Sequence, residues 1–235
     1  MSKIAIINYS GSVGKTVAAA HLFAPRMPDA LFIAVETINQ SAADLGVKNV
    51  EKLRGNNVGD LIEKLVFADD AIIDIGASNI ETFLETASRY AGAIEEIDLF
   101  VIPVTSEQKA WQESLKTVEA LAAVGIAKDK IILLPNRIER NAEEEIPAIF
   151  KYVEKSKKAR IVKGAYIYNS EIYGYLSHKK ISFDDLLNDN LDYRQLARDE
   201  KDEEKAKEYA KMYRWTKMAI PVRNNLDDVY SLIAG

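Results

Sequence analysis

Residues 10–16 carry the pattern of a phosphate-binding loop. They read Ser-Gly-Ser-Val-Gly-Lys-Thr, between an apolar run that ends at Asn8 and a second one that starts at Val17. Gly11 and Gly14 allow the backbone to curl, so that successive N–H groups can point at a phosphate. The lysine can then reach the β- and γ-phosphates, and the threonine hydroxyl can bind Mg²⁺. The pattern predicts this loop between a buried strand and a helix.

The same loop provides most of the candidate ligands for a nucleotide. The predicted contacts are Gly11, Ser12, Val13, Gly14, Lys15, Thr16 and Val17. Lys15 is also a candidate catalytic residue, because it would stabilise charge on the transferred phosphate, and Thr16 is a candidate metal ligand. Tyr9 stands where the general pattern GxxxxGK[ST] has its first glycine. The alternative is a surface loop that contains Gly-Lys-Thr by chance.

Two later polar segments follow apolar runs. Asp74 lies near the end of the run that starts at Ala71, where its carboxylate would lie beside the loop and hold Mg²⁺ through water. Asp74 is therefore a candidate catalytic residue and metal ligand. The alternative is that it only caps a helix. Asn136 and Arg137 follow the run at Ile131–Leu134, and the amide of Asn136 could read the edge of a base. The alternative is that both are ordinary loop residues.

Short apolar runs alternate with helical patterns along the chain. Strands are predicted at Lys3–Asn8, Leu31–Glu36, Ala71–Ile75, Leu99–Val104, Ile131–Leu134 and Arg160–Tyr168. Helices are predicted at about 15–24, 57–67, 79–92, 106–124 and 142–155. Several strands are apolar almost throughout, which is typical of parallel strands covered on both faces. The predicted fold class is α/β, a doubly wound, mostly parallel sheet flanked by helices, with ligands at the carboxyl ends of the strands.

Composition excludes several classes of function. The chain has 235 residues, a formal net charge of −5 and no cysteine. The absence of cysteine excludes disulfides, a thiol nucleophile and cysteine-bound zinc or iron–sulfur centres. The two histidines, His21 and His178, lie far apart and are predicted to be structural. No apolar stretch approaches the roughly 18–20 residues of a membrane span and no signal segment is visible, so a cytoplasmic protein without membrane contact is expected.

Two lysine-rich segments are candidate contacts to DNA. They cover residues 151–163 and 205–223. Positive groups in number bind backbone phosphate without reading sequence, so a weak nonspecific DNA contact is one interpretation. The net negative charge gives no general attraction for nucleic acid, and acidic residues precede both segments. Solvated helix faces are therefore the alternative.

The loop, the strands that end near Asp74 and Val104, and the Asn136-Arg137 pair together resemble the ParA/MinD class of P-loop ATPases. The resemblance covers about residues 1–185. Within the class, Asn-Tyr-Ser-Gly-Ser-Val-Gly-Lys-Thr, Val-Glu-Thr-Ile-Asn and Ile-Asp-Ile-Gly-Ala-Ser-Asn are most similar to the StbB proteins of plasmid stability operons. The resemblance implies ATP and Mg²⁺ as cofactors and a role in plasmid stability, partition and conjugative transfer. It also implies a plasmid-encoded DNA-binding partner protein and a homodimer.

The carboxyl-terminal part is predicted to be helical. A capped helix start is expected at Ser182, and one long helix over 192–218. An apolar stripe from Leu226 to Ile233 lacks the basic residues of a membrane-binding helix and is predicted to pack in the core. We therefore expect one P-loop ATPase-like domain over residues 1–235, with a helical extension over about 185–235.

Two positions depart from the pattern of the class. Ser10 stands where the class has a lysine that reaches across a dimer to the partner's nucleotide. Ile38 replaces the second aspartate of Asp-x-Asp, a residue expected near the attacking water or the metal. Glu36 is the candidate catalytic residue that could substitute for it. Because positioning and charge stabilisation dominate phosphoryl transfer, both losses predict slow or partner-dependent hydrolysis with nucleotide binding retained.

Three functions stay open at this point. The first is a switch in which MgATP orders the segments near 36–41 and 75–80 and so changes a surface that a partner protein reads. The second is a nucleotide-binding adaptor without significant hydrolysis, for which Ser10 and Ile38 argue. The third is an ATP-dependent small-molecule enzyme, comparable to dethiobiotin synthetase, although the sequence has no distinct acceptor motif.

Overall fold

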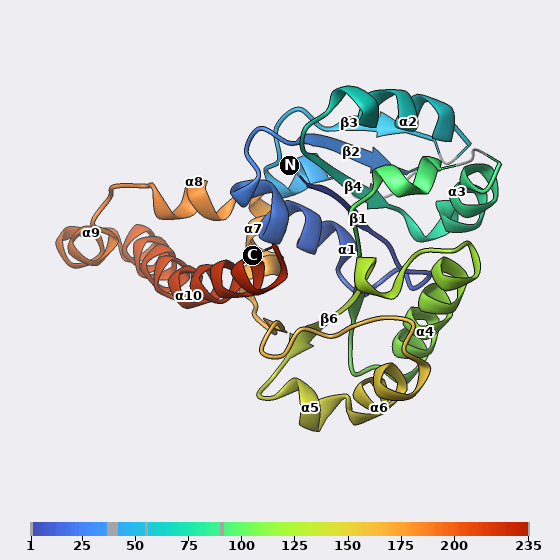
Figure 1. Cartoon of the computed structure of the whole chain (residues 1–235). Coiled ribbons are helices and arrows are strands. Elements are labelled where there is room, and N and C mark those ends of the chain that lie inside the picture. The colour runs from blue at the N-terminus through green and yellow to red at the C-terminus, as the bar shows by residue number, and fades with distance from the viewer. Residues whose placement is uncertain (1, 37–41, 55, 90–91, 235) are drawn as a thin grey trace.

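Seven parallel strands form one sheet in the described part of the chain. The computed structural model describes residues 2–36, 42–54, 56–89 and 92–234. The strands are β1 (Lys3–Ile6), β2 (Leu31–Val35), β3 (Glu51–Leu53), β4 (Ala71–Ile75), β5 (Leu99–Val104), β6 (Ile131–Ile138) and β7 (Ile167–Tyr168). Their order across the sheet is β3-β2-β4-β1-β5-β6-β7, and the pairings are parallel (Figure 1). The predicted fold class is confirmed.

Helices cover both faces of this sheet. They are α1 (Lys15–Val17), α2 (Val58–Phe67), α3 (Ile80–Ala87), α4 (Gln108–Ala123), α5 (Ala142–Glu145), α6 (Pro147–Ser156), α7 (Ile172–Lys179), α8 (Phe183–Leu187), α9 (Tyr193–Asp199) and α10 (Glu203–Ala234). Because side chains alternate along a strand, β1 contributes to two apolar clusters. Ile4 and Ile6 join the cluster that contains α7 and α10, whereas Ala5, together with Ile7 directly after the strand, joins the cluster that contains α2, α3 and α4.

The two edges of the sheet differ from the prediction. The predicted strand over Arg160–Tyr168 is wrong in its extent, because only β7 and an isolated bridge between Ile132 and Arg160 pair with β6. Gly164, with a φ of +81°, interrupts the extended backbone between these two pairings. At the opposite edge, β3 was not predicted, because Glu-Lys-Leu contains no apolar run that would indicate a strand.

The predicted single helix over 192–218 is also wrong. The chain forms α9 and α10 with a break between them. The carboxylate of Asp202 accepts hydrogen bonds from the backbone N–H groups of Glu204 (3.1 Å) and Lys205 (3.0 Å), so it starts α10 as an N-cap. Of the predicted helix over 79–92, α3 ends at Ala87, and residues 90 and 91 lie outside the described residues.

Helix α10 packs against the helical segment that follows the phosphate-binding loop. That segment continues from α1 as a π-helix over Ala18–Phe23, and Arg26 after it forms an ion pair with Asp227 of α10 (2.6 Å). Leu226 and Val229 of α10 are fully buried, so the predicted core packing of this stripe is confirmed. The first part of α10 extends away from the sheet with α8 and α9 (Figure 1). No helix among the described residues is long and apolar enough to span a bilayer.

One asparagine of α10 closes the outer edge of β7. The side-chain amide of Asn225 donates to the carbonyl of Tyr166 (3.0 Å) and accepts from the N–H of Tyr168 (3.2 Å). These two bonds imitate the donor and acceptor of a neighbouring strand. The edge of the sheet is therefore satisfied by a side chain at this point.

His21 lies within the core beside α7 and α8, in agreement with its predicted structural role. It is 2% exposed, and its ring contacts the rings of Tyr173 and Phe183 at centroid distances of 5.9 and 5.2 Å. Burial lowers the pKa of its imidazole to about 4. The histidine is therefore neutral at pH 7 and contributes to packing.

Candidate nucleotide-binding site

The predicted phosphate-binding loop lies between β1 and α1, at the carboxyl edge of the sheet. Gly14 has a φ of +88°, which strongly favours glycine, and a Cβ there would lie 2.5 Å from Nδ2 of Asn136. Gly11 differs, because its φ is not positive and a Cβ there would meet nothing within 4 Å. The curl of the loop therefore depends on Gly14, and the steric argument for Gly11 does not hold.

Lys15 is folded back onto the loop that carries it. Its Nζ atom donates to the carbonyl oxygens of Asn8 (3.0 Å) and Ser10 (2.6 Å), and the residue is 6% exposed. Burial lowers the pKa of this ammonium group, and the negative charges of Asp74 and Glu36 oppose the shift. A cation is thus held at the centre of the loop.

Asp74 of β4 is a buried carboxylate next to this cation. The residue is 1% exposed, and neither carboxylate oxygen has a hydrogen-bond partner among the described residues. Burial raises the pKa of this carboxyl group, while the neighbouring Thr16 hydroxyl and Lys15 ammonium lower it. Buried carboxylates normally have partners, so this one lacks a group that would satisfy it. Mg²⁺ fits, because it prefers hydroxyl and carboxylate oxygens.

Glu36 reaches the same place from the end of β2. The carbonyl of Val35 accepts hydrogen bonds from Gly76 N (3.0 Å) and Asn79 Nδ2 (3.3 Å), which ties the end of β2 to the end of β4. A Cβ at Gly76 would lie 3.2 Å from Cγ of Glu36, so glycine permits this close approach. Burial and the charge of Asp74 raise the pKa of Glu36. Ile38 and the rest of the predicted switch segment 37–41 lie outside the described residues.

A cavity of about 440 Å³ opens above the loop. Its lining consists of Gly11, Ser12, Gly14, Lys15, Thr16, Val17, Glu36, Gly76, Ala77 and Arg137. The structure thus brings together eight of the predicted site residues around one space. The other three predicted site residues do not line the cavity and are buried. Val13 and Asp74 are at most 1% exposed, and Asn136 is 4% exposed. The size is within the usual range of ligand cavities, about 300–1,000 Å³.

Solved structures of MinD proteins and of a plasmid partition protein are similar to this chain. The MinD cell division ATPase of Pyrococcus furiosus is similar with a TM-score of 0.56 and 13% identity, over 97% of this chain and 99% of that one. The MinD of Pyrococcus horikoshii, complexed with Mg-ADP, has a TM-score of 0.50 and 14% identity, over 99% and 98%. A Borrelia burgdorferi protein assigned to plasmid partition, bound to AMPPNP, has a TM-score of 0.51 and 14% identity, over 91% and 97%.

The chain has the fold of the MinD-type P-loop ATPases. This agrees with the predicted class and with the doubly wound sheet. No protein-family model and no curated protein sequence matches the chain. At identities this low, the likeness establishes the fold of the chain.

In this MinD-type fold, Asn136 and Arg137 end β6 beside the loop. The Asn136 side chain donates to the carbonyl of Val13 (2.7 Å) and accepts from the N–H of Arg137 (2.9 Å). Arg137 has a φ of +57°, and its exposed side chain lines the cavity. The predicted reading of a base by Asn136 stays a prediction.

Sequence reasoning missed the polar contacts that hold the loop against α4. The side chain of Asn8 donates to the carbonyl of Pro103 (2.7 Å) and to Oγ of Ser114 (2.7 Å), and Tyr9 N donates to Oγ1 of Thr117 (3.0 Å). Ser114 and Thr117 are fully buried. The signal was two hydroxyl side chains three residues apart on a helix that is otherwise apolar on that face.

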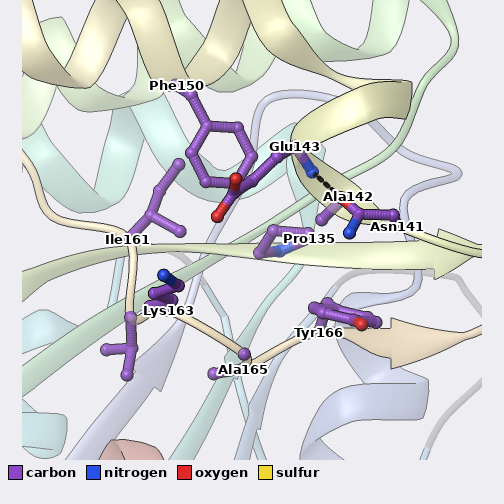
Figure 2. A pocket seen from close by; sticks show the side chains of 11 residues that line it. Pro135, Asn141, Ala142, Glu143, Phe150, Ile161, Lys163, Ala165 and Tyr166 are labelled. Carbon is purple, nitrogen blue, oxygen red and sulfur yellow. Dashed lines mark hydrogen bonds between the residues drawn. The ribbon is translucent and has the colours of Figure 1, made fainter.

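A second, smaller cavity is lined by Pro135 of β6 and by residues of α5 and α6. Its volume is about 160 Å³, and Figure 2 shows Glu143, Phe150 and Lys163 around it. The dashed line in Figure 2 is the hydrogen bond from Glu143 N to Oδ1 of Asn141 (2.8 Å), which caps α5. This cavity shares no lining residue with the one above the loop. It is therefore not the acceptor subsite that a small-molecule enzyme would need beside the phosphates.

Proposed function

We propose that this chain is a MgATP-binding switch protein of the ParA/MinD type. The observation that carries the proposal is the unpartnered, buried carboxylate of Asp74 behind a phosphate-binding loop whose lysine and threonine line a nucleotide-sized cavity. The fold and the AMPPNP and Mg-ADP complexes of the similar structures support it. In this proposal the whole chain, residues 1–235, works as one P-loop ATPase-like domain.

The residues present fit a magnesium nucleotide. Thr16 and Asp74 would hold Mg²⁺, which when bound offsets the charge of the phosphates. Backbone N–H groups of residues 11–16 would bind the phosphate oxygens, and Lys15 would leave its two loop carbonyls to contact the β- and γ-phosphates. Arg137 places a second cation at the rim of the same cavity. Asn136 belongs to this site as well, where its side chain bonds the loop at Val13.

Hydrolysis is expected to be slow or to depend on a partner. Ser10 is 5% exposed and uncharged, so position 10 offers no cation to a second copy of the chain. Glu36 is the acidic residue that lines the cavity, and burial together with the charge of Asp74 raises the pKa of its carboxyl group. The buried, neutral Ser10 also favours a second candidate function, a nucleotide-binding adaptor without significant turnover.

The biological role is taken from the resemblance. We propose a cytoplasmic protein of plasmid stability, partition and conjugative transfer, which acts with a plasmid-encoded DNA-binding partner and as a homodimer. Direct contact with DNA would be weak and nonspecific. Three cations of the two lysine-rich segments, Lys158, Lys207 and Arg223, already contact carboxylates of the chain itself, which reduces the charge available to phosphate.

Calorimetric titration of MgATP and MgADP tests the proposal. We expect binding to the natural chain and a loss of about 100-fold or more in Lys15→Ala, because a buried charge contact is removed. Lys128→Ala is the matched control. Lys128 is exposed and lies just before β6, at the amino ends of the strands, whereas the loop lies at their carboxyl ends. Turnover measured on the same samples separates the switch from the adaptor. No binding of either nucleotide to the natural chain would refute both.

A further inference from the structure

The side chain of Asn136 is engaged by two parts of the site. It is 4% exposed, and its hydrogen bonds reach Val13 in the loop (2.7 Å) and Arg137 near the end of β6 (2.9 Å). The orientation of the amide is fixed by its partners, because a carbonyl needs a donor and an N–H needs an acceptor. Nδ2 therefore faces Val13 and Oδ1 faces Arg137. The bond from Asn136 to Val13 spans 123 positions of the chain.

We propose that Asn136 is a positioning residue that clamps the phosphate-binding loop to Arg137. The inference rests on the proposed function, since it concerns how the same site grips a triphosphate. In this role Asn136 sets the shape of the loop whether or not a base is present. It differs from a base-reading residue, whose contribution would depend on the base.

The loop is shaped to receive this amide. A Cβ at Gly14 would lie 2.5 Å from Nδ2 of Asn136, a distance that real Cβ atoms do not adopt. The amide of Asn136 thus occupies the space that a side chain at position 14 would need. The bond to Val13 then holds the carbonyl just before Gly14, whose φ of +88° turns the loop toward Lys15.

The other half of the clamp stabilises Arg137. Its φ of +57° is uncommon for a residue with a side chain, so the backbone needs contacts that hold it there. The bond from Arg137 N to Oδ1 of Asn136 is such a contact, and the arginine side chain then lines the cavity opposite the loop. Asn136 therefore fixes Lys15 and Arg137, the two cations of the cavity, relative to each other.

Comparison of two ligands distinguishes positioning from base reading. MgATP and magnesium tripolyphosphate share the phosphate chain, but only ATP has a base. We expect Asn136→Ala to weaken both by the same factor, about 10-fold, because a buried hydrogen bond to the loop is lost. Asn169→Ala is the control, since the side chain of Asn169 bonds Glu139 on the surface (2.7 Å) and should leave both affinities unchanged. Weakening of ATP alone would overturn the proposal in favour of base reading.

Hydrogen exchange of the free protein gives an independent readout. Asn136→Ala should speed exchange of the backbone N–H groups of residues 9–17, while β1 and β6 keep their protection. Unchanged exchange of that segment would overturn the clamp. If the natural chain binds neither ligand, the proposed function fails, yet the exchange experiment still decides whether Asn136 orders the loop. Asn136→Leu, which fills a similar volume without hydrogen bonds, replaces the alanine variant if that one does not fold.

Discussion

The unpartnered carboxylate of Asp74 leads to an unusual expectation for stability. Asp74 is 1% exposed, and burial raises the pKa of its carboxyl group despite the nearby Thr16 hydroxyl and Lys15 ammonium, so its charged form destabilises the folded chain. In the absence of Mg²⁺ and nucleotide, Asp74→Asn should therefore raise the free energy of unfolding by about 1–3 kcal/mol at pH 7. For a chain of this length that corresponds to about 2–12 °C in Tm.

The sign of the pH dependence follows from the direction of the pKa shift. Burial raises the pKa of Asp74 above its ordinary value of 3.8, so the folded protein binds this proton more tightly than the unfolded chain. The contribution to stability is fully present below pH 3.8 and is lost as the pH rises through the folded pKa. Asp74→Asn should remove this loss, so the gain over the natural chain should grow between pH 4 and pH 7.

Thermal unfolding followed by circular dichroism in EDTA measures both effects. The exposed Asp69→Asn, which precedes β4, is the matched control and should change Tm by less than about 1 °C. With Mg²⁺ and ATP the advantage of the variant should shrink, because a ligand at 100 times its Kd adds about 2.7 kcal/mol to the natural chain and less to the variant. A lower Tm of Asp74→Asn in EDTA would refute the reasoning that the buried charge of Asp74 destabilises the folded chain.

Three further predictions concern the loop and its helix. Gly14→Ala should abolish nucleotide binding in calorimetry, whereas the affinity of Gly11→Ala should stay within about threefold of that of the natural chain. The reason is that, of these two glycines, only Gly14 has a positive φ and a blocked Cβ position. Equal losses of affinity would contradict this. His21→Phe should reduce the pH dependence of the free energy of unfolding between pH 6.5 and 4. In this range the natural chain loses about 3 kcal/mol, because the imidazole binds a proton in the unfolded chain but not in the folded one. An unchanged pH dependence in urea titrations would contradict this. Arg26→Met should lower Tm by about 2–6 °C, because the carbonyls of the π-helix and Asp227 lose their donor; an unchanged Tm would show that α10 is held by apolar contacts alone.

The sheet and the loop could be predicted because their signals are local. β1, β4 and β5 are continuous apolar runs, and the loop needs only a glycine, a lysine and a threonine in fixed order. The placement of Asp74 follows from the same reasoning, since the carboxyl ends of parallel strands meet at one edge. The structure brings Glu36 to that edge as well, because it directly follows β2.

The parts that could not be predicted depend on partners far away in the chain. Asn8 bonds Ser114, 106 residues later, and Asn136 bonds a loop carbonyl 123 residues earlier. Neither spacing leaves a pattern in one sequence, because an asparagine reads the same whether it holds a loop or a base. The break between α9 and α10 is different, since aspartate is a common capping residue and Asp202 lies within a charged run that gives no other sign of a helix end.

The asparagine that closes β7 limits how copies of this chain can associate. Asn225 occupies the donor of Tyr168 and the acceptor of Tyr166, so an eighth strand from a second molecule would have to displace α10. The opposite edge is β3, three residues long with a lysine at its centre, which gives an incoming strand little to pair with. A continuous sheet through two subunits is thus disfavoured at both ends. In a symmetric assembly, two copies must instead contact each other through helices, or face to face with the nucleotide-sized cavity of one copy opposite that of the other.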